Sequence, residues 1–201
     1  TSTLKLRTQD IAYSIQKWNP DIICMQEYNT NDRPNDIANH ATYFNKNYPY
    51  NYFSKDIQIA EKSYFLGCII FSKYPIINAQ RIAYTNQESL IYVDLLRGDD
   101  TIRIFTTHLA SYRFKQNDFI ALEATAQANS IDINGKKGVL RKMRTAFVER
   151  AVQAQIVKKY LDESPYPSII TGDFNDVPSS YTYKTIRGDW SDSFLEKGFG
   201  I

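Results

Sequence analysis

The chain has 201 residues, of which 43% are hydrophobic, so it can bury one substantial core and fits a single globular domain. With 24 basic and 22 acidic residues its net charge is only +2, which excludes a strong overall field for nucleic acid or an anionic membrane. No apolar run has the length of a membrane span, and the polar opening TSTLKLRTQD is not a signal peptide.

The first predicted elements are a helix and a strand. Apolar residues recur at helical spacing over residues 8–18, and Asn19-Pro20 then blocks continuation of the helix. The next stretch, DIICMQEYN, has consecutive apolar residues at 22–25, which is typical of a central strand covered on both faces. Glu27 is then expected at the exit end of this strand.

The middle of the chain is predicted to be rich in strands. Ile37, Ala41 and Phe44 indicate a second helix. Consecutive strands follow, which implies antiparallel pairing: YNYF, SYFLGCIIFSKYPI, NAQRIAYT, SLIYVDLL and TIRIFTTHL. The turn Gly98-Asp99-Asp100 joins the last two into a hairpin whose second strand delivers His108 at its far end.

The last third of the chain is predicted to contain a long helix and one more strand. Residues 113–137 are polar and include the Asn134-Gly135 turn signal. Apolar residues then repeat near helical spacing, which predicts a long amphipathic helix through Leu140, Met143, Phe147, Ala151, Ala154, Val157 and Leu161. Pro165 and Pro167 end this helix, and residues 168–171 form a short buried strand that leads into Gly172-Asp173-Phe174-Asn175.

The order of these elements indicates a layered α/β sandwich, because strands come before, between and after helices. No internal repeat, low-complexity tract or linker divides the chain, so a single domain is expected over residues 1–201. Cys24 and Cys68 each lie in an apolar stretch, where a buried free thiol is favoured over a disulfide.

Glu27, His108 and the Asp173/Asn175 pair share a setting, because each is predicted to end a buried strand. Taken singly, each has a structural explanation: a solvated strand end, a satisfied core histidine and a turn. Taken together at one sheet edge, a carboxylate, an imidazole and an acid–amide pair supply the parts for metal-assisted hydrolysis. In extended backbone, positions 173 and 175 project to the same side.

Five motifs occur in order along the chain: Q-E at 26–27, F-S-K-Y-P-I at 71–76, T-H-L at 107–109, R-A-V-Q-A from Arg150, and G-D-F-N-D-V-P-S-S at 172–180. In this order and spacing they resemble the endonuclease/exonuclease/phosphatase superfamily, which has the deoxyribonuclease I-like fold. The resemblance implies a four-layer α/β/β/α sandwich of mainly antiparallel sheets. It also implies hydrolysis of phosphate esters with a divalent cation, usually Mg²⁺, with Mn²⁺ as an alternative.

The same resemblance implies a role for each candidate. Glu27 matches the metal-binding Glu, and His108 matches the histidine that contacts the phosphate or assists proton transfer. Asp173 would orient or deprotonate the attacking water, and Asn175 would hydrogen-bond the phosphoryl oxygens. These residue types suit the roles, since Mg²⁺ prefers carboxylate oxygens, a carboxylate accepts a proton and an amide offers neutral donors. Two thiols in apolar strands and only two histidines argue against a zinc cluster.

Other polar residues are weaker candidates. Ser179 or Ser180 is expected to cap a short helix, and His40 is expected to be incidental. Arg150 is expected either to stabilise the loops beneath the site or to be solvated. Basic residues between Lys136 and Arg150 form a local basic surface that could approach a polyanion, although a solvated helix face is favoured.

The sequence also departs from the family pattern at both ends. Members usually begin with a strand that carries an Asn near the metal and finish with an Asp-His pair on a late strand, and this sequence has neither. We therefore expect a domain incomplete at both ends, lacking the first strand and the C-terminal strands. Such a piece by itself is expected to be inactive and poorly folded, so the functional prediction concerns the parent protein.

The resemblance predicts a phosphodiesterase that uses in-line attack of water, with an endonuclease or exonuclease as the first choice. The alternatives are a phospholipid (sphingomyelinase-like) or small-phosphoester hydrolase and, from another class, a non-catalytic binding module. The predicted partner is a phosphodiester substrate, with nucleic acid as one candidate, and a monomer is favoured. Substrate and compartment stay open, because loops set selectivity and an export signal or membrane anchor would lie before residue 1.

Overall fold

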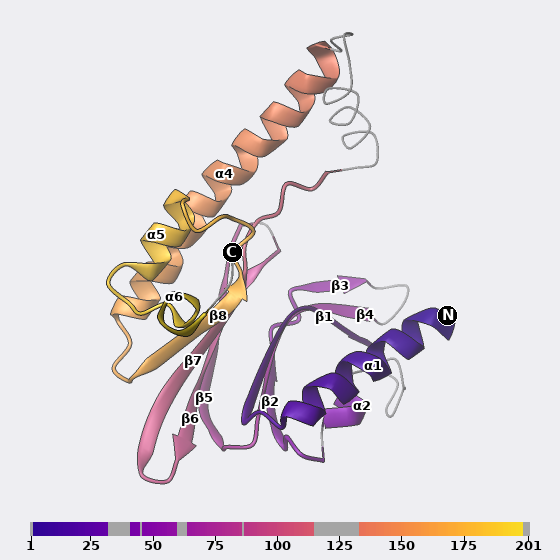
Figure 1. The fold of residues 1–201 in the computed structure, drawn as a ribbon, viewed down its shortest axis with the longest axis vertical. Coiled ribbons are helices and arrows are strands. Elements are labelled where there is room, and N and C mark those ends of the chain that lie inside the picture. The colour runs from indigo at the N-terminus through magenta and orange to yellow at the C-terminus, as the bar shows by residue number, and fades with distance from the viewer. Residues whose placement is uncertain are drawn as a thin grey trace. The chain divides into compact units, whose positions relative to one another are not determined.

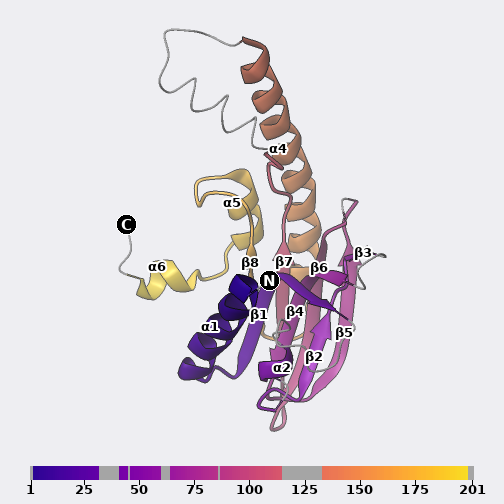
Figure 2. The ribbon, with the colours of Figure 1, turned by 90° about the vertical axis from the view of Figure 1, so that its right-hand side faces the viewer.

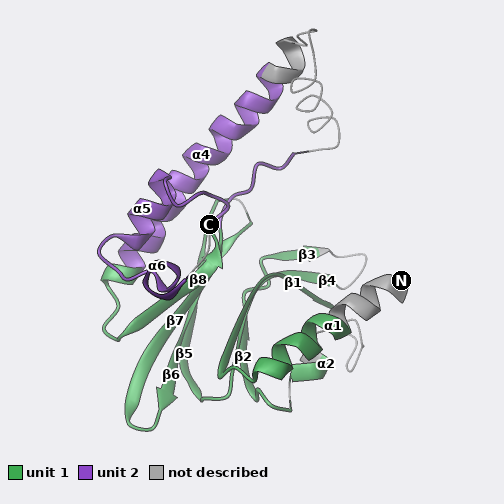
Figure 3. Ribbon diagram, viewed as in Figure 1, with its two compact units in different colours: residues 1–108, 161–173 green, residues 109–160, 174–201 purple. Residues whose placement is uncertain are grey.

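The computed structural model describes most of the chain, namely residues 2–31, 41–44, 46–59, 64–85, 87–114 and 133–198. The chain divides into two compact units (Figure 3). Unit 1 comprises residues 1–108 and 161–173, and unit 2 comprises residues 109–160 and 174–201. Each unit is described by itself below.

Unit 1 contains two helices and all the strands that the structure describes (Figure 1). In chain order they are α1 (Ser2–Trp18), β1 (Ile22–Asn31), α2 (Ala41–Phe44), β2 (Tyr50–Phe53), β3 (Ile57–Ile59), β4 (Tyr64–Ser72), β5 (Ile76–Ala83), β6 (Ser89–Arg97), β7 (Asp100–His108) and β8 (Ser168–Asp173). Unit 2 holds α4 (Ile133–Asp162, except its last two residues), α5 (Tyr181–Arg187) and α6 (Ser193–Lys197).

The strands form two sheets. Sheet A has the order β1-β4-β2, with β3 also paired to β4, and all its described pairings are antiparallel. Sheet B has the order β5-β6-β7-β8, in which only β7 and β8 run parallel. This parallel pair is possible because the long connection between β7 and β8 includes α4. The predicted α/β fold with mainly antiparallel sheets is therefore confirmed.

Strand β4 supplies alternate residues to two hydrophobic cores, because successive side chains of a strand point to opposite faces. The helix-side core contains Ala12, Ile23, Tyr28, Phe44, Tyr48, Ile69 and Phe71. The inter-sheet core contains Cys68, Ile70, Ile91, Val93, Leu95 and Ile104. Unit 1 is thus built in three successive layers, with α1 and α2 on sheet A and sheet A on sheet B (Figures 1 and 2).

Strand β1, predicted to be central, and strand β8, predicted to be buried, both lie at sheet edges in the described part of the chain. Among the described strands, β1 pairs only with β4, and β8 pairs only with β7. Ile169 of β8 is 54% exposed, so the prediction of a buried strand at residues 168–171 is wrong for the described residues. A run of consecutive apolar residues reports local hydrophobicity, whereas the number of neighbouring strands depends on distant segments.

The observed helix boundaries agree with the predicted ones in part. Helix α1 ends at Trp18 before Asn19-Pro20, as predicted, but it starts at Ser2 rather than residue 8. Helix α2 spans Ala41–Phe44, and Ile37 lies outside the described residues. The Asn134-Gly135 turn prediction is wrong, because α4 starts at Ile133 and runs through both residues. At the first turn of a helix of 30 residues, two turn formers cost little, since Asn and Gly are tolerated near helix N-termini.

The predicted amphipathic face of α4 is correct in its second half only. Ala154, Val157 and Leu161 are buried as expected, whereas Leu140 is 63% exposed and Phe147 is 44% exposed. In the first half the buried positions are shifted by one residue, to Val139, Ala146 and Arg150. The buried position next to the predicted Ala151 is thus held by an arginine.

Two other predictions about unit 1 are confirmed, the turn at Gly98 and the free thiols. Gly98 turns the chain from β6 into β7 with φ of +64°, a conformation that favours glycine. Cys24 and Cys68 are free thiols, and burial raises the pKa of Cys24 to about 11 despite a hydrogen bond to Thr171. None of the helices in the described ranges is long and apolar enough to cross a membrane.

Candidate functional site

Glu27 occupies a β-bulge inside β1. The pairing between β1 and β4 shifts from Met25 opposite Ile69 to Tyr28 opposite Gly67, so β1 contains one extra residue there. Glu27 has φ of +49°, which is uncommon for a residue other than glycine. The prediction that Glu27 ends its strand is therefore wrong, because β1 continues to Asn31.

The bulge leaves the Glu27 side chain outside both cores. Met25 before the bulge and Tyr28 after it both pack on the helix-side core, although three positions apart would place them on opposite faces of a regular strand. Between them, Gln26 Nε2 donates a hydrogen bond of 2.8 Å to Thr106 Oγ1 of β7. Glu27 is the inserted residue, and its carboxylate-bearing side chain is 79% exposed.

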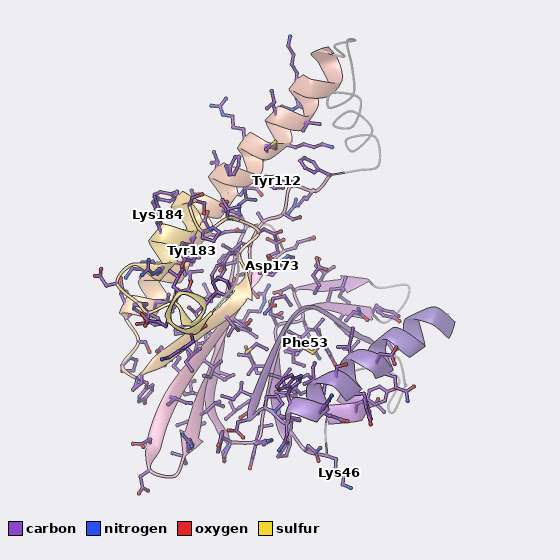
Figure 4. All side chains as sticks on the ribbon, viewed as in Figure 1. Lys46, Phe53, Tyr112, Asp173, Tyr183 and Lys184 are labelled. Atoms are coloured by element: carbon purple, nitrogen blue, oxygen red, sulfur yellow. The ribbon has the colours of Figure 1, made fainter. Side chains whose placement is uncertain are left out.

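His108 and Asp173 are brought together by strand pairing. They are the last residues of the parallel strands β7 and β8, and they lie opposite each other in the register (Figure 4 labels Asp173). His108 Nε2 lies 3.9 Å from Glu27 Oε1 and 4.0 Å from Asp173 Oδ2. The structure thus places one imidazole within 4.0 Å of two carboxylates that come from residues far apart in the sequence.

This arrangement of three groups suits proton transfer next to an anion. The two distances are about 1 Å longer than a typical hydrogen bond, which leaves Nε2 close to both carboxylates. An imidazole can give a proton to a substrate oxygen, and a carboxylate can take one from water. The roles predicted for Glu27, His108 and Asp173 remain predictions.

The oxygen atoms of Glu27 and Asp173 fit a hard divalent cation better than zinc. Within the described ranges, no group of three or more His, Cys, Asp or Glu side chains is arranged to hold a metal. Mg²⁺ is commonly held by only one or two carboxylates and keeps several water ligands, whereas structural zinc needs four protein ligands. An exposed carboxylate such as Glu27 can bind a cation of the first kind.

Asn175 belongs to unit 2, and its contacts are described within that unit. Its Nδ2 donates a hydrogen bond of 2.9 Å to the backbone oxygen of Leu109, the residue that follows His108 in the sequence. Its φ is +50°, and β8 has ended at Asp173. The prediction that Asp173 and Asn175 share one side of an extended strand is therefore wrong.

Arg150 is buried, so the possibility that it is solvated is wrong. Its side chain is 0% exposed and its guanidinium donates to the backbone oxygen of Ala110 and to Asp176. Asp176 was not singled out in the sequence, although the D-F-N-D run contains it as a second acid. The other expectation, that Arg150 stabilises loops, agrees with these contacts, although nothing local in the sequence identified the partners.

The remaining candidates are resolved in part. Ser180 caps α5 as predicted, accepting a hydrogen bond of 3.1 Å from the Tyr183 amide. Lys137, Arg141 and Arg144 are exposed on α4, as expected for a solvated basic face. His40 lies outside the described residues.

Comparison with known proteins gives a family match over nearly the whole chain. The profile of the Endonuclease/Exonuclease/phosphatase family matches residues 2–195. No curated protein matches the chain. The structural similarities below are at low sequence identity and therefore concern the fold.

Three solved structures illustrate this similarity. Sphingomyelinase C from Streptomyces griseocarneus has a TM-score of 0.61 and 18% identity, over 93% of this chain and 62% of that protein. A beta toxin variant from Staphylococcus aureus with bound magnesium ions has a TM-score of 0.62 and 15% identity, over 93% of this chain and 63% of that protein. TDP2 from Caenorhabditis elegans has a TM-score of 0.54 and 19% identity, over 88% of this chain and 44% of that protein. The chain thus spans less than two thirds of the length of each of these proteins.

Proposed function

Because the chain belongs to the endonuclease/exonuclease/phosphatase family, a superfamily of phosphoester hydrolases, we propose that it cleaves phosphodiester bonds with a divalent cation. The family resemblance predicted from the five motifs is confirmed by this match. The observation that carries the proposal is the position of His108 within 4.0 Å of the carboxylates of Glu27 and Asp173. A structural histidine would not require two exposed acids around it.

In the proposed reaction, water attacks the phosphorus in line with the leaving oxygen. Asp173 orients the water and takes its proton, and His108 donates to a substrate oxygen. Glu27 would hold the cation, which when bound supplies a positive charge beside the phosphate that polarises its oxygens. The proposal is supported by the exposure of Glu27 and by the preference of Mg²⁺ for carboxylate oxygen, and Mn²⁺ has the same preference.

We also propose that Asn175 donates its amide hydrogen bonds to the phosphoryl oxygens. Two peptide units separate it from Asp173, so the Cα atoms of the two residues lie within about 7 Å of each other. A neutral amide can stabilise developing negative charge without adding a charge of its own to the site. The family profile runs through both units, which supports one catalytic domain over residues 1–201.

For the substrate we propose nucleic acid first and a phospholipid second. Nucleic acid is supported by the exposed cations Lys137, Arg141 and Arg144 on α4, which suit a chain of phosphates. The similarity to a sphingomyelinase C supports the phospholipid alternative, with sphingomyelin as its simplest test substrate. A monomer remains the favoured state.

The first prediction concerns Asp173. The full-length protein is assayed with Mg²⁺ or with EDTA against plasmid DNA, RNA, sphingomyelin and bis-p-nitrophenyl phosphate. We expect EDTA to abolish cleavage, and Asp173→Asn to lower kcat about 100-fold or more because it removes a general base. Circular dichroism of the variant should be unchanged, since Asp173 is exposed.

Asp99→Asn is the matched control, because Asp99 lies in the exposed turn between β6 and β7 and should leave kcat unchanged. Cleavage that survives EDTA would contradict metal dependence. Cleavage of sphingomyelin alone would favour the phospholipid alternative. A folded protein that cleaves none of the four substrates would favour a non-catalytic binding module.

A further inference from the structure

Arg150 connects two loop segments within unit 2. Its Nη1 donates a hydrogen bond of 2.8 Å to the backbone oxygen of Ala110. Its Nε donates one of 3.2 Å to Asp176 Oδ2. Ala110 and Asp176 are 66 positions apart in the chain, and the guanidinium holds both at once.

Asn175 is held between the same two segments. Its Nδ2 donates to the oxygen of Leu109, the neighbour of Ala110, and Asn175 itself is the neighbour of Asp176. Arg150 therefore holds Asp176, which follows Asn175, and Ala110, which follows Leu109. Leu109 is the residue whose oxygen accepts the Asn175 hydrogen bond. One turn further along α4, Gln153 Oε1 accepts a hydrogen bond of 2.9 Å from the Ala110 amide.

The surroundings of Arg150 require a guanidinium. The Asp176 carboxylate, with a side chain 5% exposed, balances its buried charge. The guanidinium carbon lies 4.7 Å from the ring centre of Tyr112 (labelled in Figure 4) and 4.9 Å from that of Phe147. Nη2 has no hydrogen-bond acceptor among the described residues, so the faces of these rings offset part of its lost hydration.

We propose that Arg150 is a positioning residue for Asn175 in the phosphodiesterase reaction. The inference rests on the proposed role of Asn175. A lysine at position 150 keeps the charge but not the planar fork, so it cannot bind Ala110 and Asp176 and stack on both rings. With Arg150→Lys, the two segments lose their link through the guanidinium and keep only the Asn175–Leu109 hydrogen bond, so the Asn175 amide is held less firmly in its place.

The test is a double-mutant cycle on the full-length protein, with kcat and KM measured for wild type, Arg150→Lys, Asn175→Ala and the double variant. We expect Arg150→Lys to lower kcat about 10- to 100-fold with KM nearly unchanged, because small misplacements of catalytic groups cost about that much. When Asn175 is already alanine, adding Arg150→Lys should change kcat less than about twofold. Arg97→Lys, at the exposed end of β6, is the control and should leave kcat unchanged.

If the separate effects of Arg150→Lys and Asn175→Ala on kcat multiply in the double variant, the inference is overturned. Such a result would show that Arg150 acts independently of Asn175. If Arg150→Lys does not fold, Gln153→Leu takes its place in the cycle, since it removes the acceptor of the Ala110 amide without touching a charge. Its effect on kcat should be smaller, about threefold to tenfold, and should also disappear in the Asn175→Ala background.

A second readout separates this inference from the proposed function. The side-chain amide protons of Asn175 are followed by NMR, and Arg150→Lys is expected to shift their resonances and speed their exchange with solvent about tenfold or more. Unchanged resonances would overturn the positioning role even if the enzyme is active and depends on Asn175. A wild-type protein that hydrolyses nothing would overturn the proposed function, while the NMR comparison still decides whether Arg150 holds Asn175.

Discussion

Glu27 reaches His108 because one extra residue interrupts the alternation of β1. In a regular strand its side chain would face the helix-side core, where a carboxylate would be costly to bury. Because of the bulge, Tyr28 rather than Glu27 packs in the helix-side core, and Glu27 is exposed. Opposite Tyr28, β4 has Gly67, a residue without a side chain at a crowded place.

The third prediction concerns Gly67. A Cβ at this position would lie 2.1 Å from Ser54 Oγ and 2.9 Å from Asp56 Oδ2. Ser54 Oγ accepts a hydrogen bond from the Cys68 amide and donates one to Asp56, so it cannot move without breaking both. We expect Gly67→Ala to lower the free energy of unfolding by about 1–3 kcal/mol, measured by urea denaturation.

Gly138→Ala is the matched control, because the same substitution meets no atom within 4 Å in α4. Alanine is a better helix former than glycine, so this variant should be more stable by up to about 1 kcal/mol. A Gly67→Ala protein as stable as wild type would contradict this prediction. It would show that the Ser54 hydroxyl can move away from the new methyl group without loss of stability.

At the scale of elements, α5 shows a helix that depends on its cap. It has only seven residues, and only Thr182 and Ile186 are buried. A helix this short is marginal without tertiary contacts, so each satisfied amide at its N-terminus counts. The Ser180 side chain satisfies the amide of Tyr183.

The fourth prediction follows from this cap. Ser180→Ala leaves the Tyr183 amide without its acceptor and should lower the free energy of unfolding by about 1 kcal/mol. Thermal and urea denaturation measure the change. Ser179→Ala, at the exposed neighbour outside the cap, should cost less than about 0.5 kcal/mol. Equal losses in the two variants would contradict the assignment of Ser180 as the cap.

At the scale of the whole molecule, stability depends on pH through a buried ion pair in sheet B. Asp94 of β6 faces Arg103 of β7, with Arg103 Nε 2.6 Å from Asp94 Oδ1 and Nη2 2.9 Å from Oδ2. Burial alone would raise the pKa of Asp94, but hydrogen bonds from Arg103 and Asn78 outweigh it and hold this pKa below its ordinary value. The ionised pair is thus favoured in the folded state.

The fifth prediction is the sign of this dependence. Because the folded pKa of Asp94 is lowered, its contribution to stability is complete above about pH 4 and is lost as the pH falls through the lowered pKa. We expect Asp94→Asn to be less stable than wild type at pH 7, with the difference shrinking in acid. Urea denaturation at several pH values measures it, with Asp99→Asn as the control that keeps the wild-type profile. A difference that stays constant down to the acid limit would contradict the assignment.

Much of this protein was decided by its sequence alone. Strands β2, β4, β5, β6 and β7 were predicted near their observed places, and so were the ends of β7 and β8 that carry His108 and Asp173. These features depend on local properties, namely apolar runs, turn formers and blocking prolines. The ordered motifs likewise predicted the family, because motif order is a property of the sequence itself.

The tertiary structure decided the rest. The bulge at Glu27 and the edge positions of β1 and β8 were not predicted, and for Arg150 the sequence left a loop-stabilising and a solvated position open. Each depends on which distant segment lies next to the residue: β4 for Glu27, and the loops at Ala110 and Asp176 for Arg150. A charged side chain is buried only where such a partner offsets its lost hydration, and no local pattern records where that partner comes from.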